Sequence, residues 1–472
     1  MRASCVLAST LVAAASAATI QSNLSPTQDP GVYPGDDVNP PNGWSTLPNI
    51  PGARADNSTL VVGRGNATLM HYIDESYDAS KIKRAVIQIH GENRDGWNQW
   101  IYADLAAKRA ASGGSFSRDE VVVMAPQFFI TVDDGAYPFD STLKTTTVSS
   151  ESDIAKLTST STSRTPQATL RSNMQLKKRQ SRPVIVEKIS TSQVMIWKTV
   201  EWGDGSPAYE PNNSRGAGSF DALDAAVNFF LDRERFPELR KVVVAGFSLG
   251  GQLVNRYATF RYNTPDDNRV IYWVSSPNSF VYLTGNRPAS IGKDCRRSYA
   301  DYKYGLNGTL PQYVTKADNE LTASQLITRY LSRTVYYLCG VKDRTAGNSD
   351  CAANAQGLHH VSKMFHWTNE YLPLLPGSTG VRGKLPSNSL LRWVDQTGHE
   401  DWKLINSDPG IELAWLKGFN ADGSDATAPP SNGVTAADTP TINAASASAA
   451  LSLSKAGLAA FVLGVSLLPS LI

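Results

Sequence analysis

Charged residues are scarce in this chain of 472 residues, where Asp, Glu, Lys and Arg make up 19%. The two signs nearly balance, with 45 Lys and Arg against 43 Asp and Glu, for a formal net charge of +2. This balance excludes a protein that binds nucleic acid through its overall charge, and it also excludes an acidic, solvated tail protein. Hydrophobic residues make up 41% of the chain. This share is too high for a protein that is disordered overall and too low for a polytopic membrane protein.

Both ends of the chain carry targeting patterns. Residues 1–18 hold one basic residue, then an apolar run and Ala-Ser-Ala, which is typical of a secretory signal peptide. Residues 456–472 carry no charge, and a Ser/Ala spacer separates them from the small residues that begin at Asn443. This order is typical of glycosylphosphatidylinositol (GPI) attachment, whereas a membrane-spanning helix usually has about 20 apolar residues and a basic flank. We expect a secreted, extracellular protein that a GPI lipid at Asn443 anchors to the plasma membrane or cell wall.

Secretion predicts oxidised cysteines and glycosylation. Of the four cysteines, Cys5 lies in the signal peptide, so Cys295, Cys339 and Cys351 can form one disulfide. Two pairings are favoured, Cys339 with Cys351 and Cys295 with Cys351, and we adopt the first as the prediction. No Cys-x-x-Cys or zinc-ligand spacing occurs. The predicted glycosylation sites, each in an Asn-x-Ser/Thr triplet, are Asn57, Asn66, Asn212 and Asn307.

Between the two ends the sequence predicts one large α/β domain over residues 59–419. Short apolar runs rich in β-branched residues alternate there with helical patterns, which predicts a mostly parallel sheet of about eight strands flanked by helices. The main strands are predicted at 84–90, 120–129, 241–246, 269–276, 334–340 and 389–395.

Three segments lack the periodicity of this domain. Residues 19–58 are rich in Pro, Gly and Asn and are predicted to form a loose N-terminal arm. Residues 141–192 begin with a Ser/Thr-rich stretch and are predicted to be a disordered, low-complexity insertion. Residues 420–455, rich in Ser, Ala, Thr and Pro, are predicted to be a linker.

A Gly-x-Ser-x-Gly motif, Gly246 to Gly250, follows the strongest predicted strand and precedes a helical pattern. In this context the serine occupies a strained turn that exposes its hydroxyl, and the glycines let the helix pass close to neighbouring strands. The motif alone is weak, but its position between strand and helix predicts that Ser248 is a nucleophile. A structural serine in a tight turn is the alternative.

Over most of residues 84–417 the chain resembles the α/β-hydrolase superfamily, in particular its secreted fungal hydrolases. The resemblance rests on the motif around Ser248, on the order of the elements, and on His90-Gly91, which follow a strand where the family places its oxyanion-hole loop. It implies an α/β-hydrolase fold. It also implies a catalytic acid after the penultimate core strand and a histidine after the last.

Candidates exist for both remaining members of a Ser-His-Asp triad. Among the six histidines, His399 follows the last predicted strand and is predicted to be the base. Asp343 directly follows the strand before it and is predicted to be the acid, with Asp350 and Asp395 as rivals. We read the three histidines on a helical pattern, His359, His360 and His366, as surface or core residues.

The oxyanion hole is predicted to consist of backbone N–H groups, from Leu249 and from either Gly91 or Glu92. We expect a serine hydrolase whose acyl-enzyme forms on a small-molecule or polymeric carboxylic ester. An amidase or peptidase of the same fold, or a catalytically silent surface protein, is the alternative. No cofactor, metal or nucleic-acid partner is predicted, and contact with the membrane is expected only through the lipid anchor.

Overall fold

The computed structural model describes residues 24–32, 43–63, 65–137, 146–148, 182–184, 193–211, 214, 216–316, 321–345 and 350–442. Outside these ranges lie the predicted signal peptide and C-terminal tail, Asn212 and Asn443, and all but two short pieces of the predicted insertion at 141–192. Those two pieces form strands β8 (Thr146–Val148) and β9 (Arg182–Val184), which pair with each other. Among the described residues, no helix has the length and apolar character needed to cross a membrane.

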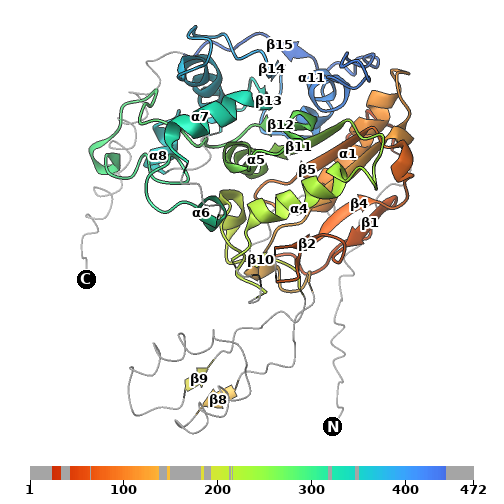
Figure 1. The fold of residues 1–472 in the computed structure, drawn as a ribbon, viewed down its shortest axis with the longest axis horizontal. Coiled ribbons are helices and arrows are strands. Elements are labelled where there is room, and N and C mark those ends of the chain that lie inside the picture. The colour runs from red at the N-terminus through yellow and green to blue at the C-terminus, as the bar shows by residue number, and fades with distance from the viewer. Residues whose placement is uncertain are drawn as a thin grey trace, which may run out of the picture.

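A nine-stranded sheet forms the centre of the fold, in the order β1-β4-β6-β5-β11-β12-β13-β14-β15. Strands β4 and β15 run antiparallel to their neighbours, and the strands from β6 to β14 run parallel. The bounds are β1 Ala53–Asp56, β4 His71–Asp74, β5 Arg84–Ile89, β6 Val121–Pro126, β11 Lys241–Phe247, β12 Val270–Ser275, β13 Thr334–Gly340, β14 Ser389–Val394 and β15 Ala436–Ala437. The predicted α/β class, with a mostly parallel central sheet flanked by helices, is confirmed (Figure 1).

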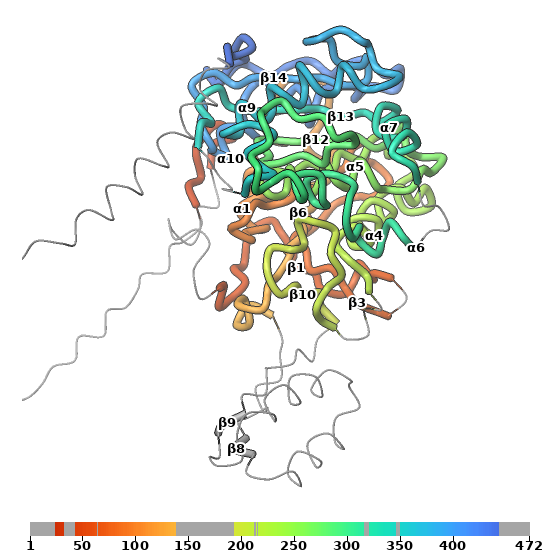
Figure 2. Tube along the Cα trace, turned by 90° about the vertical axis from the view of Figure 1, so that its left-hand side faces the viewer, coloured from red at the N-terminus to blue at the C-terminus, as the bar shows by residue number. Residues whose placement is uncertain are grey.

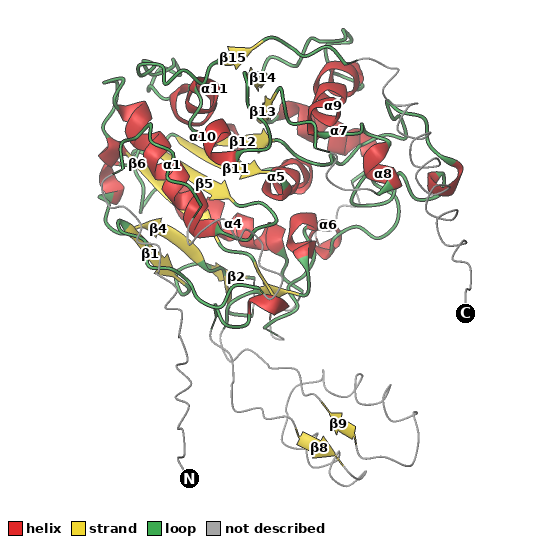
Figure 3. Cartoon of the chain, turned by 180° about the vertical axis from the view of Figure 1, so that it is seen from behind, coloured by secondary structure: helices red, strands yellow, loops and turns green. Residues whose placement is uncertain are grey.

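Two hydrophobic cores cover the two faces of this sheet. In β11, Val242 and Val244 pack into one core, while Val243 and Ala245 pack into the other, because successive strand residues face opposite sides. The first core takes side chains from α4 (Ser219–Leu231), α5 (Leu249–Phe260) and α7 (Ala323–Ser332). The second takes them from α1 (Gly96–Ala111), α10 (Asp401–Ile405) and α11 (Asp408–Ile411). Figure 3 shows the strands enclosed by these helices.

Shorter elements complete the fold. Strands β2 (Val61–Val62) and β3 (Ala67–Thr68) form a short antiparallel hairpin. Strand β7 (Phe129–Ile130) pairs with β10 (Ile196–Trp197). The other α-helices of the described residues are α6 (Gln312–Lys316), α8 (Cys351–Asn354) and α9 (His360–Phe365).

The domain extends beyond its predicted bounds at both ends. Strand β1 lies in the predicted arm, yet it pairs with β4 in the main sheet, and Trp44 is buried with its ring centroid 4.7 Å from that of Trp97. Strand β15 lies in the predicted linker, yet it pairs with β14. Both segments satisfy their backbone groups through strands that are distant in sequence. In Figure 2 the sheet runs through the molecule from β14 to β1.

The predicted disulfide between Cys339 and Cys351 is wrong. Cys351 pairs instead with Cys295, the alternative pairing, with Cα atoms 5.8 Å apart. Cys339 is a free cysteine because it lies in the interior of β13, where its side chain packs into the first core. Cys295 belongs to a separate small cluster of buried residues with Tyr304, Ala352 and Ala353. Of the predicted glycosylation sites, Asn57, Asn66 and Asn307 are exposed.

Candidate active site

Ser248 lies in the sharp turn between β11 and α5. Its φ of 55° and ψ of −116° place it in a backbone conformation that is strained for a residue with a side chain. The flanking glycines are required by close backbone contacts. A Cβ atom at Gly246 would lie 2.3 Å from the carbonyl oxygen of Gly250, and one at Gly250 would lie 2.5 Å from that of His90. The motif therefore folds as the strained turn that its sequence context predicts.

A continuous chain of hydrogen bonds joins Ser248, His399 and Asp343. The Oγ atom of Ser248 lies 3.0 Å from Nε2 of His399, and Nδ1 of His399 lies 2.8 Å from Oδ2 of Asp343. His399 stands in the loop after β14, with 26% of its side chain exposed, whereas Asp343 follows β13 and is fully buried. The structure thus brings together the three residues predicted as nucleophile, base and acid.

The environment of Asp343 favours its ionised form. Burial alone would raise the pKa of this carboxyl group, but hydrogen bonds from His360 and His399 outweigh burial and hold the pKa well below its usual range. A carboxylate at this position can only accept hydrogen bonds, so Nδ1 of His399 must carry a proton. Nε2 is then free to accept the proton of the Ser248 hydroxyl.

The two rival acids make other contacts. Oδ2 of Asp350 accepts a hydrogen bond from the Tyr304 hydroxyl at 2.5 Å, and Asp350 precedes the first residue of α8. Oδ1 of Asp395 accepts hydrogen bonds from the backbone and side-chain nitrogens of Gln396. The carboxylate in contact with His399 belongs to Asp343.

The predicted oxyanion donors flank Ser248. Leu249 is the first residue of α5, so its N–H belongs to the helix terminus that lacks intrahelical acceptors. On the other side, a Cβ atom at Gly91 would lie 3.4 Å from Cβ of Ser248. Glu92 follows in the same loop, and the direction of its N–H is set by the peptide bond that it shares with Gly91.

His90 holds that peptide bond in place. Its Nδ1 lies 2.8 Å from the Gly91 carbonyl oxygen, while its Nε2 accepts a hydrogen bond from the backbone N–H of Phe128 at 3.0 Å. Burial lowers the pKa of His90 to about 3, so the ring stays neutral, with its proton on Nδ1. Because the C=O and N–H of one trans peptide bond point in opposite directions, His90 fixes the direction of the Glu92 N–H.

The next three carbonyls of the loop are also held by side chains. The Glu92 carbonyl accepts from Arg94 Nη1 at 2.9 Å, the Asn93 carbonyl from Trp44 Nε1 at 2.7 Å, and the Arg94 carbonyl from Gln127 Nε2 at 2.6 Å. The Arg94 guanidinium also forms a buried, two-point ion pair with Asp133, at 2.8 and 3.0 Å. We call residues 90–95 the oxyanion loop. Two of its four held carbonyls are bound by side chains of the loop itself, His90 and Arg94, and two by side chains from other segments, Trp44 and Gln127.

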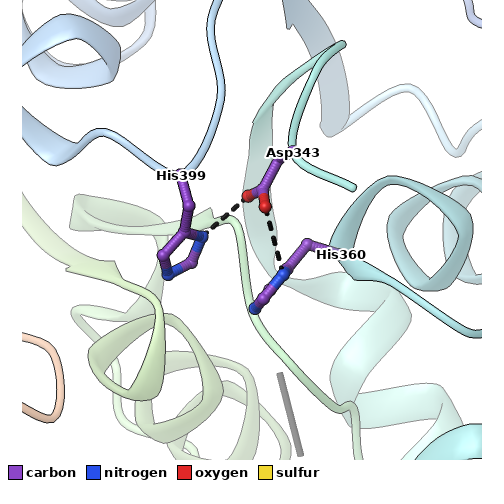
Figure 4. A group of neighbouring side chains, drawn as sticks. All are labelled: Asp343, His360 and His399. Atoms are coloured by element: carbon purple, nitrogen blue, oxygen red, sulfur yellow. Dashed lines mark hydrogen bonds and ion pairs between the residues drawn. The ribbon is translucent and has the colours of Figure 1, made fainter. Parts of the chain in front are cut away.

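A second histidine, His360, contacts the buried acid. Nδ1 of His360 lies 3.1 Å from Oδ1 of Asp343, and its ring centroid lies 4.2 Å from that of His399 (Figure 4). The sequence interpretation placed His360 among surface or core residues and missed this contact. No local signal could have revealed it, because His360 opens a short helix that reaches Asp343 only through the packing of α9 against β13.

Asp343, His360 and His399 are also the one group of three potential metal ligands found in the described part of the chain, with ligand atoms within 4.8 Å of one another. Two imidazoles and a carboxylate would suit a transition-metal ion such as Zn²⁺. The same three groups also satisfy one another directly, as two N–H donors on one carboxylate. The sequence prediction of no metal did not foresee this cluster.

No protein-family model matches the chain, and no curated protein sequence matches it. Several solved structures do. The poly(3-hydroxybutyrate) depolymerase LpqC from Bordetella parapertussis is 18% identical, covers 73% of this chain and 83% of its own, and has a TM-score of 0.41. The S-formylglutathione hydrolase from Agrobacterium tumefaciens is 12% identical, covers 79% of this chain and 98% of its own, and has a TM-score of 0.37. The siderophore hydrolase EstB from Aspergillus nidulans is 14% identical, covers 75% of this chain and 91% of its own, and has a TM-score of 0.34. Similarities this distant carry no activity from one chain to another.

Proposed function

We propose that this protein is a serine hydrolase that cleaves carboxylic esters through an acyl-enzyme. The observation that carries the proposal is the hydrogen-bonded chain from Ser248 through His399 to Asp343, which starts at a strained strand-to-helix turn. A serine hydroxyl is a weak nucleophile by itself, and an adjacent histidine held by a carboxylate activates it. A structural serine would need neither the strained turn nor the histidine.

In the first half of the reaction, Ser248 Oγ attacks the ester carbonyl carbon while its proton passes to Nε2 of His399. The negative charge that develops on the carbonyl oxygen is stabilised by the N–H groups of Leu249 and Glu92. When the tetrahedral intermediate collapses, the bond to the alkoxide breaks and His399 donates its proton to that leaving group. Asp343 stabilises the transient imidazolium and keeps the ring in the required tautomer.

In the second half, water takes the place of the alcohol. Nε2 of His399 accepts a proton from the water as its oxygen attacks the acyl carbon, and a second tetrahedral intermediate forms. Collapse of this intermediate breaks the bond to Ser248 Oγ, which recovers its proton from His399, and releases a carboxylic acid. In each half of the reaction His399 accepts one proton and later donates one, so the enzyme returns to its starting state.

Turnover of acyl esters tests the proposal. Purified protein is expected to hydrolyse p-nitrophenyl esters and to form an acyl adduct, visible by intact-protein mass spectrometry when deacylation is slow. Ser248→Ala should abolish both signals. Matched anilides of the same acyl groups separate an esterase from an amidase or peptidase. No turnover of esters or anilides by folded protein would favour the catalytically silent surface protein and contradict the proposal.

We also propose that the enzyme works outside the cell, attached to the plasma membrane or cell wall through a GPI anchor. The apolar, uncharged pattern of residues 456–472 supports this location, as do the exposed positions of three predicted glycosylation sites. Treatment of intact cells with a phosphatidylinositol-specific phospholipase should release the protein, and substitution of Asn443 and its small neighbours should prevent anchoring. Protein that stays inside the cell with an intact N-terminus would contradict this location.

A further inference from the structure

His360 is a buried histidine that the triad does not require, yet it lies directly on the triad acid. Only 4% of its side chain is exposed, and its Nδ1 faces Oδ1 of Asp343, while His399 takes Oδ2. The two imidazole rings are inclined by 33°, with centroids 4.2 Å apart. Figure 4 shows both rings in contact with the same carboxylate. The acid is therefore shared between two histidines.

The surroundings of His360 fix its tautomer. Besides Asp343 Oδ1 at 3.1 Å, its Nδ1 lies 3.2 Å from the carbonyl oxygen of Thr345, and neither oxygen can donate a hydrogen bond. The Thr345 hydroxyl, 3.4 Å from Nδ1, donates to Asp343 Oδ1 at 3.2 Å. Nδ1 must therefore carry a proton. Burial lowers the pKa of His360 below its ordinary value, against the opposing effect of the bond to Asp343, so the ring stays neutral where an exposed histidine begins to titrate.

We propose that His360 is a positioning residue, which holds the second oxygen of Asp343 and thereby keeps the carboxylate aligned with His399. The site is then a chain of four residues, Ser248, His399, Asp343 and His360. The proposal rests on the proposed hydrolase function, because it assigns His360 a role in that same proton transfer. His360 acts through Asp343, and its polar contact is with Oδ1 of that carboxylate.

The N–H group of His360 orients the Asp343 carboxylate. As a donor to Oδ1 it restrains rotation of the carboxylate, which keeps Oδ2 aligned with His399, and Thr345 Oγ1 donates to the same Oδ1 at 3.2 Å. Loss of the His360 donor should therefore leave the carboxylate less well oriented toward His399.

Other charged groups surround this pair. Lys363, on the same helix as His360, is buried and donates to Asn278 Oδ1 at 2.6 Å; burial lowers its pKa to about 8. Arg344, in the loop after β13, and His359, just before α9, are also close enough to interact electrostatically with each other, and His359 interacts with Asp343 and His360. The buried carboxyl group of Asp401 interacts electrostatically with His399. These groups remain in place in every variant below, so differences between variants report on His360.

Three substitutions separate the roles of His360. His360→Phe keeps a ring but removes the donor, whereas His360→Asn keeps an N–H at a position close to Nδ1. His366→Phe is the matched control, because His366 follows the same helix and its Nδ1 binds Glu370 instead, at 2.6 Å. All assays contain EDTA, so that a metal ion bound to the cluster does not contribute. Thermal unfolding confirms that each variant is folded.

We expect His360→Phe to lower kcat by about tenfold with little change in KM, because a misaligned acid affects the chemical step more than substrate binding. His360→Asn should restore most of kcat. His366→Phe should match the wild type in both kcat and KM. A His360→Phe enzyme that matches the His366→Phe enzyme in kcat would overturn the proposal, as would a His360→Asn enzyme no better than His360→Phe.

A measurement without turnover keeps this test separate from the proposed function. In protein labelled with ¹⁵N-histidine, the two Nδ1–H groups on Asp343 should give two low-field proton signals, and one of them should be missing in His360→Phe. If ester hydrolysis fails but both signals appear, the proposed function is wrong and the shared carboxylate stands. If hydrolysis succeeds and the wild type shows no second low-field signal, the inference about His360 is wrong. If His360→Phe does not fold, the wild-type and His360→Asn spectra decide: a missing second low-field signal in the wild type overturns the proposal.

Discussion

Two sides of the active site are held in different ways. The oxyanion loop is fixed through its backbone, because four successive carbonyls, from Gly91 to Arg94, accept hydrogen bonds from side chains. On the acid side, one buried carboxylate is shared by two histidine side chains, and one of them is partly exposed. The difference matches the tasks that we propose. Backbone donors must stay still while charge develops on the substrate, whereas the histidine must exchange protons with substrate and water.

The largest effect should come from the acid side. His399→Ala removes the proposed base, and we expect kcat for p-nitrophenyl esters to fall by about 10⁴-fold or more. His366→Ala, which removes a histidine with a separate partner, should keep wild-type activity. Hydrolysis rates of the two variants, measured side by side, check this prediction. An His399→Ala enzyme that keeps a tenth of the wild-type rate would contradict the role given to this side chain.

The disulfide should stabilise the acid side without taking part in the chemistry. The bond between Cys295 and Cys351 spans 56 residues, and loop-closure entropy for a loop of this length predicts about 4 kcal/mol of stability. Urea unfolding of the Cys295→Ser/Cys351→Ser double variant should show this loss. The wild type in reductant should match the double variant, while reductant should not change the double variant itself. Equal stability of oxidised wild type and double variant would contradict the pairing.

On the oxyanion side, a buried carboxyl should make stability depend on pH. Asp95 is 2% exposed, and burial, together with the charge of Asp401, raises its pKa to about 7. Because the folded state holds this proton more tightly than the unfolded state, Asp95 costs stability as the pH rises from about 4 to 7. Asp95→Asn should therefore raise the free energy of unfolding by about 3 kcal/mol at pH 8 and leave it nearly unchanged at pH 4.

Urea unfolding at the two pH values checks the Asp95 prediction. Other titrating groups, His90 among them, are common to both proteins, so their contributions cancel in the difference. Asp119→Asn, a change at an exposed position, serves as the control and should have little effect at either pH. The same stability change from Asp95→Asn at pH 4 and pH 8 would show that the buried carboxyl does not titrate as described.

The smallest effect should come from the loss of a single hydrogen bond that holds the oxyanion loop, the one from Trp44 to the Asn93 carbonyl. Trp44→Phe keeps an aromatic ring against Trp97 but removes the hydrogen bond to the Asn93 carbonyl. A lost hydrogen bond of about 1 kcal/mol should lower kcat by about fivefold, with KM nearly unchanged. Trp393→Phe is the matched control, since in the described structure the buried Nε1 of Trp393 has no hydrogen-bond partner. Equal kcat values for the two variants would show that this bond does not help to hold the loop.

The sequence was sufficient where the signal is local. A strong strand, a Gly-x-Ser-x-Gly turn and a helix are contiguous, so Ser248 and its conformation follow from one stretch of chain. Asp343 and His399 each follow a predicted strand, and parallel strands bring their carboxyl ends to one edge of the sheet. The α/β fold followed from the alternation of apolar strands with helical patterns.

Contacts between distant segments could not be predicted. Trp44 lies in a segment rich in Pro and Gly, and only the packing of that segment against the oxyanion loop reveals its role. His360 reaches Asp343 through helix packing, and the cysteine pairing depends on which residue faces the interior of β13. The extra strands β1 and β15 are short and form because a partner strand offers free backbone groups, which leaves little trace in composition.

Labelling with a fluorophosphonate tests the central claim most directly, because this reagent reacts with serines that a neighbouring base has activated. The purified protein is treated with the reagent and digested, and the modified peptide is mapped by mass spectrometry, with Ser248→Ala as the control. We predict a label on Ser248 that is lost in Ser248→Ala and strongly reduced in His399→Ala. Folded protein that takes up no label, or that is labelled equally in the Ser248→Ala variant, would contradict an activated serine at this site.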